Sequence, residues 1–313
     1  MSFLTIFTAT YNRGYIIGNL FESLKRQTLK DFQWVVIDDG SSDNTSELFD
    51  AWLQEDCGFP VIYKKVENGG KQRAINQGVQ LAKTPYIFIV DSDDILSDDA
   101  VESIFRWTRD IDALPEFAGV AGVKGDLAGN YIDGKEPLIP KDQFVDATNL
   151  ERRQYHIPVE MAEVFKTDIL RRYPFPVWKD EKFISEGYVW DSIAMDGYKL
   201  RWYNRIIYKF EYQEDGYVRN GNKIYRENLI GAARMYDLQE RRVKVFHNGK
   251  FSWTWLKYML YLTREIGVAC CLKGDLSFLR ETHRPWVCYL QLPLAWLLSL
   301  KRRRIIWPKE QRG

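Results

Sequence analysis

Cysteine and histidine are scarce in this sequence of 313 residues, and its three histidines lie far apart. The cysteines have neither the paired spacing of a zinc site nor the density of a disulfide-rich secreted domain. They are Cys57, Cys270, Cys271 and Cys288. The sequence therefore gives no indication of a zinc module, and its cysteine usage is typical of a reducing compartment.

The chain also lacks a long uninterrupted apolar run. In the stretch 286–300, WVCYLQLPLAWLLSL, Pro293 interrupts the pattern. Fifteen helical residues would reach only about 22 Å, less than the roughly 30 Å of a hydrocarbon core. At the other end, Met1-Ser2 leads straight into a strand-like run without a signal-peptide pattern. We therefore expect no transmembrane helix and a cytoplasmic location.

Two common nucleotide-binding motifs are missing as well. A dinucleotide-binding fold would need G-x-G-x-x-G after the first strand, where this chain has YNRG. A P-loop would need a glycine five residues before Gly70, where Lys65 stands. Neither class fits.

Charge is balanced overall but unevenly distributed. The formal net charge is +1, yet residues 241–313 carry 15 Lys and Arg against 4 Asp and Glu, a net +11. Residues 1–240 therefore carry −10. An acidic body with a basic tail suggests an appendage that faces an anionic surface, either nucleic acid or the inner leaflet of a membrane.

The N-terminal third alternates strand and helix patterns. Strands are predicted over 3–8, 32–37, 61–66 and 86–90, and helices over 16–28, after Asn44 and over 71–81. Asn44, followed three residues later by Glu47, resembles a capping box. This rhythm predicts right-handed crossovers and a mainly parallel sheet covered by helices on both faces.

Carboxylates follow the buried strand predicted over 86–90. Asp91 and Asp93 stand where that strand ends, at the sheet edge where open α/β folds bind ligands. Like charges so close need a cation, and carboxylate oxygens suit Mg²⁺ or Mn²⁺ bridging to phosphate. The alternative is that residues 94–99 merely cap the next helix, with Ser97 as N-cap. That alternative does not account for Asp91 and Asp93.

Polar loops follow the other strands too. Their sequences are Thr10-Tyr11-Asn12-Arg13, Asp38-Asp39-Gly40-Ser41, Asn68-Gly69-Gly70-Lys71 and Asp91-Ser92-Asp93. In a parallel sheet these loops would meet along one edge. The Gly69-Gly70 pair allows close backbone approach, so the following helix start with Lys71 and Arg73 could hold a diphosphate. An ordinary turn is the alternative.

Four motifs in this order, TIFTATYNRG, VVIDDGSSDNT, NGGKQRAINQG and YIFIVDSDD, resemble family 2 glycosyltransferases of the GT-A fold. The resemblance is close over residues 3–100 and continues weakly to about 215. It implies a nucleotide-diphospho-sugar donor, most often UDP-linked, and inversion at the anomeric carbon. The donor-site residues that it implies are Thr8, Tyr11, Arg13, Asp39, Lys71 and Asp91.

The resemblance also implies roles within that set. Thr8, Tyr11 and Arg13 would line the nucleotide pocket. Asp39, more than Asp38, would accept a hydrogen bond from the imide N–H of the base. Lys71 would lie near the diphosphate. By the same resemblance Asp93 would ligate Mn²⁺ or Mg²⁺, and Asp91 would lie by the ribose or the metal.

The acceptor side is expected over 101–215, where glycines between 119 and 134 suggest a turn-rich stretch. The family commonly has a Glu-Asp pair here, but Gly187 stands where the Asp would be. Glu186 is our candidate for the general base, and Asp191 is the second catalytic candidate. Alternatively, both are ordinary carboxylates near a helix N-terminus.

The tail is rich in Trp, Tyr and Leu over 251–262 and 286–300, followed by the basic run from Lys301 to Arg304. Interfacial helices on an anionic membrane fit this pattern. Packing on the catalytic domain or in a homo-oligomer fits equally. Nucleic-acid binding is disfavoured because no recognised module is present.

Together these features predict a GT-A catalytic domain over 1–215, with its nucleotide-sugar half at 1–100, and a helical, basic C-terminal region over 216–313. The expected activity is inverting, metal-dependent transfer of a sugar to a saccharide or lipid-linked saccharide acceptor in cell-surface polysaccharide synthesis, with peripheral contact to the inner membrane face. The alternative from another class is a catalytically silent sugar-nucleotide or polysaccharide-binding protein.

Overall fold

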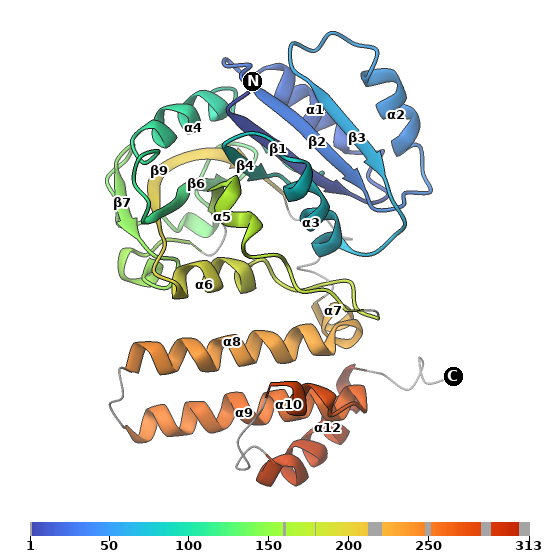
Figure 1. The fold of residues 1–313 in the computed structure, drawn as a ribbon, viewed down its shortest axis with the longest axis vertical. Helices are drawn as coiled ribbons and strands as arrows, with labels where there is room; N and C mark the ends of the chain where they lie inside the picture. Colours follow the sequence, from blue (N-terminus) through green and yellow to red (C-terminus); the bar gives the residue numbers. More distant parts are fainter. Residues whose placement is uncertain are drawn as a thin grey trace. The chain divides into compact units, whose positions relative to one another are not determined.

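A computed structural model describes residues 2–158, 161–178, 180–211, 221–247, 252–282 and 289–306 (Figure 1). Its contacts divide the chain into two compact units. The first comprises Met1–Phe175 and Val189–Gln213, and the second comprises Pro176–Tyr188 and Glu214–Gly313. Residues 176–188, which sequence analysis assigned to the catalytic domain, thus group with the second unit. The domain boundaries themselves stay a prediction.

The first unit contains an α/β sheet of nine strands in the order β3-β2-β1-β4-β8-β6-β9-β5, with β7 paired to β9. The strands are β1 (Leu4–Thr10), β2 (Phe32–Asp38), β3 (Val61–Lys65), β4 (Tyr86–Ile89), β5 (Ile95–Leu96), β6 (Phe117–Gly125), β7 (Phe144–Ala147), β8 (Met161–Lys166) and β9 (Lys199–Lys209). The helical elements are α1 (Ile17–Lys25), α2 (Thr45–Trp52), α3 (Lys71–Leu81), α4 (Ala100–Arg109), α5 (Thr167–Arg171) and α6 (Gly187–Met195), with short 3-10 turns at Ile132–Gly134 and Arg152–Tyr155.

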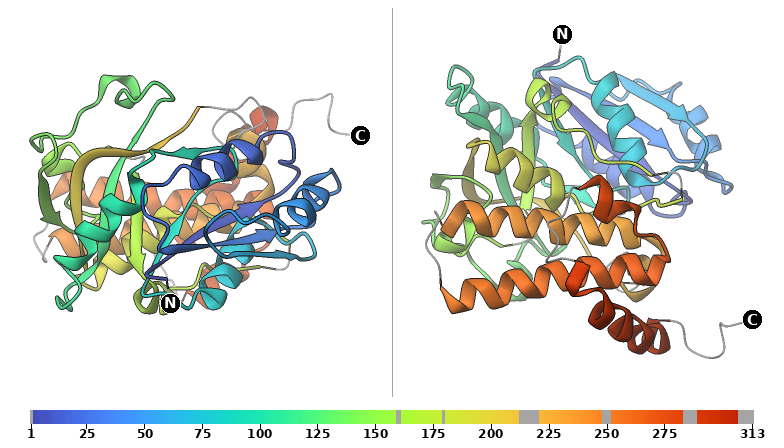
Figure 2. Two further views of the ribbon diagram at one scale, coloured as in Figure 1. Left: turned by 90° about the horizontal axis from the view of Figure 1, so that it is seen from above. Right: turned by 60° about the horizontal axis from the view of Figure 1, so that its bottom comes forward.

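The four N-terminal strands pair in parallel, as predicted. The side chains of β1 alternate between two buried faces. On β1, Leu4 and Ile6 join the main core with α1, α2 and α4. Phe7 points the other way, toward Gly78 of α3, where an added Cβ would lie 2.1 Å from the Phe7 ring. Helices therefore cover both faces (Figures 1 and 2), and this arrangement confirms the predicted fold class.

The second half of the sheet mixes directions. Strand β8 pairs antiparallel with β4 and β6, whereas β6 and β9 pair in parallel. The expectation of a turn-rich stretch from residue 119 was wrong for its first part, because Gly119 and Gly122 lie inside β6. A Cβ at Gly119 would lie 1.9 Å from the carbonyl oxygen of Val164. These glycines therefore allow neighbouring strands to approach closely, and they do not form turns.

Two predicted helix caps also differ from the structure. Asn44 occupies the N-cap position of α2, but its side chain makes no capping hydrogen bond. Instead the Asp43 carboxylate accepts from the backbone N–H of Thr45 at 3.1 Å. Helix α4 begins at Ala100 with Asp99 at the N-cap position, so Ser97 does not cap it. Ser97 instead donates its hydroxyl to Asp99 at 3.0 Å.

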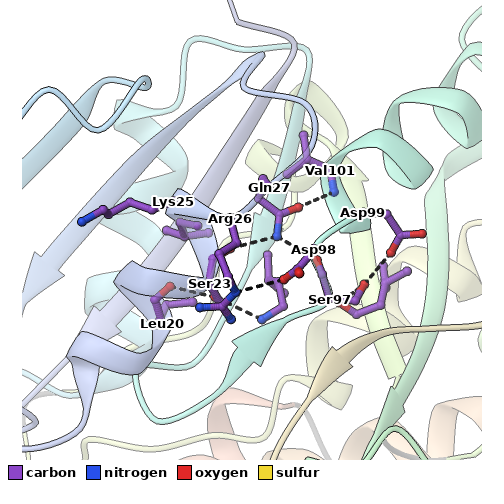
Figure 3. A network of polar contacts seen from close by, with 12 residues as sticks. Leu20, Ser23, Lys25, Arg26, Gln27, Ser97, Asp98, Asp99 and Val101 are labelled. Carbon is purple, nitrogen blue, oxygen red and sulfur yellow. Dashed lines mark hydrogen bonds and ion pairs between the residues drawn. The ribbon is translucent and has the colours of Figure 1, made fainter.

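A buried network anchors β5 and the start of α4 to the end of α1 (Figure 3). The Gln27 amide donates to the carbonyl of Ser97 at 2.7 Å and accepts from the N–H of Val101 at 3.0 Å. Ser23 accepts from the N–H of Leu96 at 3.2 Å. Because the network satisfies buried backbone groups on both sides, it fixes where the segment after Asp94 returns to the sheet.

The second unit is helical in its described part. Its helices are α7 (Gly221–Glu227), α8 (Leu229–His247), α9 (Trp253–Lys273), α10 (Ser277–Glu281) and α12 (Leu292–Ile306). Helices α8 and α9 lie side by side (Figure 2). Glu181 is buried and accepts from the N–H groups of Ile230 and Gly231, both at 2.8 Å, while Lys273 lies 3.2 Å away. This carboxylate therefore satisfies the start of α8.

The basic run at the end of α12 is partly used inside this unit. Arg302 forms an ion pair of 2.6 Å with Glu265, which is 1% exposed. Arg303 donates to the carbonyls of Cys271 and Leu272, near the end of α9. Two members of the run from Lys301 to Arg304 thus have partners inside this unit, and membrane contact through the run stays a prediction. The Arg304 side chain lies outside the described residues.

Within the described residues, no helix has the length and apolar character needed to cross a bilayer. The predicted apolar stretches extend to Phe251 and to residues 286–288, which lie outside the described residues.

Candidate active site

The loops predicted to meet at one sheet edge do follow parallel strands. Strands β1, β2, β3 and β4 end at Thr10, Asp38, Lys65 and Ile89, and each is followed by one of the polar loops. Since these strands run parallel, their carboxyl ends share an edge. The carboxyl edge of β1 to β4 is therefore the candidate active site.

The loops after β1 and β2 are joined by short hydrogen bonds. The N–H of Asn12 donates to the Ser41 hydroxyl at 2.9 Å, and the Asn12 side-chain oxygen accepts from the N–H of Ser42 at 2.7 Å. The N–H of Gly14 donates to Asp43 at 2.9 Å. Asn12 adopts a left-handed backbone with φ of 51°, which asparagine tolerates better than most residues. These hydrogen bonds hold the loops after β1 and β2 in a fixed arrangement on one side of the site.

Asp39 holds the glycine loop in front of α3. Its carboxylate accepts from the N–H of Gly69 at 2.7 Å and from the N–H of Gly70 at 2.8 Å. Asn68 donates to the Asp39 carbonyl at 2.8 Å. Gly70 has a φ of 98°, a conformation that favours glycine, and it immediately precedes Lys71 at the start of α3. Asp39 thus fixes the position of Lys71, and its predicted contact with a nucleobase stays a prediction.

Lys71 and Asp91 form the central ion pair of the site. The Lys71 ammonium lies 2.5 Å from Asp91 Oδ1, and both side chains are partly buried. Burial by itself raises the pKa of Asp91, but the charge of Lys71, with smaller effects from Lys124 and Arg13, holds that pKa below its ordinary value. Asp91 is therefore ionised at neutral pH, beside a cation at a helix N-terminus.

Asp93 has a different electrostatic setting two residues further on. Burial raises its pKa, and the negative charge of Asp91 raises it further. A carboxylate held near another negative charge gains most from a bound cation, and hard oxygen donors suit Mn²⁺ or Mg²⁺. Within the described part of the chain, no three His, Cys, Asp or Glu residues gather as a complete metal site. Asp91 and Asp93 could supply carboxylate oxygens to such a cation, and their role as metal ligands stays a prediction.

The three residues predicted to line the nucleotide pocket lie in different settings. Thr8 is fully buried, and its hydroxyl accepts from the Trp34 indole at 3.0 Å. Tyr11 is 49% exposed. Arg13 donates to the Tyr15 hydroxyl at 3.1 Å and contributes to the electrostatics of Asp91. The Thr8 hydroxyl is thus hydrogen-bonded inside the first unit. Tyr11 is exposed, and Arg13 is partly buried.

The two candidates for the catalytic carboxylate fall in different units. Glu186 belongs to the segment Pro176–Tyr188 of the second unit, just before α6 begins at Gly187. Asp191 lies on α6 in the first unit, is 9% exposed and accepts from the Asn149 amide at 2.6 Å. The ranking of Glu186 over Asp191 stays a prediction.

Two residues around Asp91, Tyr208 and Lys124, were missed by sequence analysis. Tyr208 of β9 accepts from the N–H of Asp91 at 3.0 Å and donates to Asp94 at 2.5 Å. The Lys124 ammonium of β6 lies 4.2 Å from the centre of the Tyr208 ring. Burial, followed by the charge of Asp91, raises the pKa of Asp94 to about 8. Tyr208 and Lys124 lie far along the chain from the DSDD motif, so no local pattern pointed to them.

Comparison with protein families identifies the chain. The sequence model described as "Glycosyl transferase family 2" matches residues 5–172, which is more than half of the chain. The chain belongs to glycosyl transferase family 2, a family of transferases, and the resemblance inferred from the four motifs is confirmed.

Three curated relatives illustrate the breadth of this similarity. Glycosyltransferase GlyG of Streptococcus pneumoniae is 33% identical over 110 residues, which cover 35% of this chain and 36% of GlyG. Glycosyltransferase GlyA of the same species is 30% identical over 300 residues, 89% of this chain and 39% of GlyA. The poly(ribitol-phosphate) beta-glucosyltransferase of Bacillus spizizenii is 23% identical over 268 residues, 80% of this chain and 40% of that protein. The chain thus spans about two fifths of the length of these relatives.

Solved structures share the fold. S. aureus TarS in complex with UDP-GlcNAc superposes with a TM-score of 0.61 at 14% identity, covering 97% of this chain and 92% of that one. The mannosyltransferase PcManGT from Pyrobaculum calidifontis, in complex with GDP-Man and Mn²⁺, superposes with a TM-score of 0.54 at 15% identity, covering 98% and 88%. At such identities the likeness concerns the fold, and it agrees with the GT-A class predicted from the motifs.

Proposed function

We propose that this protein is an inverting glycosyltransferase that moves a sugar from a UDP-linked donor to a saccharide or lipid-linked saccharide acceptor in cell-surface polysaccharide synthesis. The observation that carries the proposal is the Lys71–Asp91 ion pair with Asp93 beside it, at the carboxyl edge of the parallel strands. Family membership supports sugar transfer. The names of the poly(ribitol-phosphate) beta-glucosyltransferase and of the UDP-GlcNAc complex support the acceptor and donor classes.

The leaving group of such a reaction is a nucleoside diphosphate, on which negative charge accumulates as the glycosidic bond breaks. Lys71, at the N-terminus of α3, supplies a fixed positive charge, and the helix terminus adds its partial positive charge. Asp93, with Asp91, would hold Mn²⁺ or Mg²⁺. When bound, this cation supplies Lewis-acid neutralisation of the diphosphate. Asp39 contributes by keeping the Gly69-Gly70 loop, and with it Lys71, in place.

Inversion requires one direct displacement at the anomeric carbon, so a base must receive the acceptor proton on the face opposite the leaving group. We assign this role to Glu186, and we assign Asp191 to acceptor or loop contacts. The Asn149–Asp191 hydrogen bond supports a fixed orientation for Asp191. The account of the base rests on the family resemblance at this loop.

Peripheral membrane contact is the second part of the proposal. Leu294, Trp296, Leu297 and Leu300 of α12 are each between 39% and 57% exposed. Their successive spacings are two, one and three residues, and Lys301 follows them with an exposed side chain. The opposite side of α12 buries Ala295 against Gly267 of α9. An exposed apolar side that ends in a cation suits the interface of an anionic bilayer.

The transfer reaction is tested with UDP-sugars, Mn²⁺ and saccharide acceptors. Acceptor-dependent UDP release, with product of opposite anomeric configuration by NMR, is the expected result. Retained configuration would contradict inversion. Tight UDP binding without transfer to any acceptor would favour the catalytically silent binding protein.

The membrane part is tested by co-sedimentation with phosphatidylglycerol-containing vesicles. Leu294→Ser combined with Leu297→Ser should reduce binding, and Lys301→Gln should reduce it mainly at low salt. Leu127→Ser, which changes a half-exposed leucine of the first unit, is the control. Equal binding of all variants would remove this part of the proposal.

A further inference from the structure

A single buried tyrosine joins both ends of the DSDD motif. Tyr208 on β9 is fully buried. Its phenolic oxygen accepts from the N–H of Asp91 at 3.0 Å and donates to Asp94 Oδ2 at 2.5 Å. Within the motif itself, the N–H of Asp94 reaches the carbonyl of Asp91 at a longer 3.3 Å. The short contacts that define the shape of this turn therefore come from another strand.

The Tyr208 ring is itself held on several sides. In the β6–β9 pairing it stands opposite Lys124, whose ammonium lies 4.2 Å from the ring centre. In the β5–β9 pairing it stands opposite Leu96. The Phe88 ring meets it edge-on at 6.0 Å between centroids. A ring confined in this way cannot swing to follow the motif, so the motif must conform to the ring.

We propose that Tyr208 is a positioning residue for the donor site, which sets where Asp93 presents its carboxylate to the cation and where Asp91 meets Lys71. The phenol fixes residues 91 and 94, and Asp93 lies between these two fixed points. Tyr208 does not touch the donor and acts through the turn. This inference rests on the proposed function, because it assigns the turn a role in binding metal and diphosphate.

The test is Tyr208→Phe, which keeps the ring and removes both hydrogen bonds. UDP is the probe, and the readout is the Mn²⁺ concentration that gives half-maximal UDP binding. Loss of a residue that orients a metal ligand typically weakens the metal site about 10- to 100-fold. We expect that midpoint to rise roughly tenfold, with kcat recovering at saturating Mn²⁺. A purely structural role would lower thermal stability and leave the midpoint unchanged.

Tyr203→Phe is the matched control. Tyr203 lies on the same strand and is also buried, but its ring stacks on Trp107 at 4.2 Å instead of facing the motif. Its substitution should leave the midpoint at the parental value. If Tyr208→Phe does not fold, Asp94→Ala removes one of the two phenol contacts and should raise the midpoint in the same direction.

The outcomes separate the two claims. Suppose that the parental protein binds UDP in the presence of Mn²⁺ but that the Mn²⁺ midpoint is unchanged in Tyr208→Phe, or in Asp94→Ala if that variant replaces it. This result overturns the positioning role alone. Parental protein without Mn²⁺-dependent UDP binding overturns both the proposed donor site and this role.

Discussion

Lys71 and Asp91 form an ion pair of 2.5 Å, although one begins helix α3 and the other follows strand β4. Each compensates the charge of the other in a partly buried setting, where an isolated charge would be costly. A donor diphosphate would compete with Asp91 for the Lys71 ammonium. A cation bound near Asp93 would offset the negative charge that Asp91 retains. On the proposed function, the pair would therefore couple diphosphate binding to metal binding.

The metal assignment predicts the behaviour of Asp93→Asn. This variant should fold normally and lose the Mn²⁺-dependent part of UDP affinity, because a neutral amide is a poor ligand for a hard cation. Calorimetry with and without Mn²⁺ measures the difference. Asp98→Asn is the control, since Asp98 follows the same motif but is exposed and paired with Arg26 at 3.1 Å. Unchanged Mn²⁺ dependence in Asp93→Asn would show that the cation is held elsewhere.

The base assignment predicts a ranking of two variants. Glu186→Gln should lower kcat by about 10²–10⁴-fold with little change in donor affinity, as expected for loss of a positioned base. Asp191→Asn should cost less, since its remaining carbonyl oxygen can still accept from Asn149. Steady-state kinetics with a working donor and acceptor measures both. The reverse ranking would transfer the role to Asp191.

Asp94 predicts a pH dependence of stability. Its pKa is raised to about 8 by burial and then by the charge of Asp91, whereas the ordinary value is 3.8. The unfolded chain therefore releases this proton near pH 4 and the folded chain near pH 8. The contribution of the neutral Asp94 carboxyl to the stability of the folded state is therefore complete below about pH 4 and is lost as the pH rises toward 8.

Asp94→Asn removes this titration while keeping an acceptor for Tyr208. The melting temperature of the variant minus that of the parent, measured in EDTA, should therefore increase between about pH 5 and pH 8. A flat difference for Asp94→Asn would mean that Asp94 is ionised in the folded protein throughout this range.

The ion pair of Arg302 predicts that substitutions at the adjacent residues Arg302 and Lys301 differ in their effect on stability. Arg302→Gln leaves the buried Glu265 without its partner at 2.6 Å and should destabilise the protein by about 1–3 kcal/mol, with the partial exposure of Arg302 limiting the cost. Lys301→Gln, at an exposed position, should change stability by less than about 0.5 kcal/mol. Urea unfolding measures both. Equal effects would contradict a structural role for Arg302.

The sequence predicted the N-terminal half of the sheet closely because its signals are local. Helix α3 begins and ends at the predicted residues, Lys71 and Leu81. The features that the sequence did not predict depend on partners that lie far away along the chain. The glycines of β6 looked like turn residues because the close approach of β8 at Gly119 leaves no local trace. The ion pair of Arg302 could not be foreseen either, because its partner, Glu265, lies on another helix.

In the candidate site too, the residues with local sequence signals could be predicted and those with distant partners could not. Asp39, Lys71, Asp91 and Asp93 could be named from motifs, since each follows a predicted strand. Tyr208 could not, because its contacts with Asp91 and Asp94 span 117 and 114 residues. Only the pairing of β9 with β5 and β6 brings it to the motif.

The central claim, metal-assisted binding of a uridine diphosphate donor, is tested most directly by a thermal-shift panel of nucleotides and nucleotide-sugars with and without Mn²⁺. We predict that UDP and UDP-sugars raise the melting temperature only when Mn²⁺ is present, and that Asp93→Asn abolishes this shift. A panel in which no nucleoside diphosphate shifts the protein with Mn²⁺, or in which UDP acts equally without the metal and in Asp93→Asn, would contradict the account.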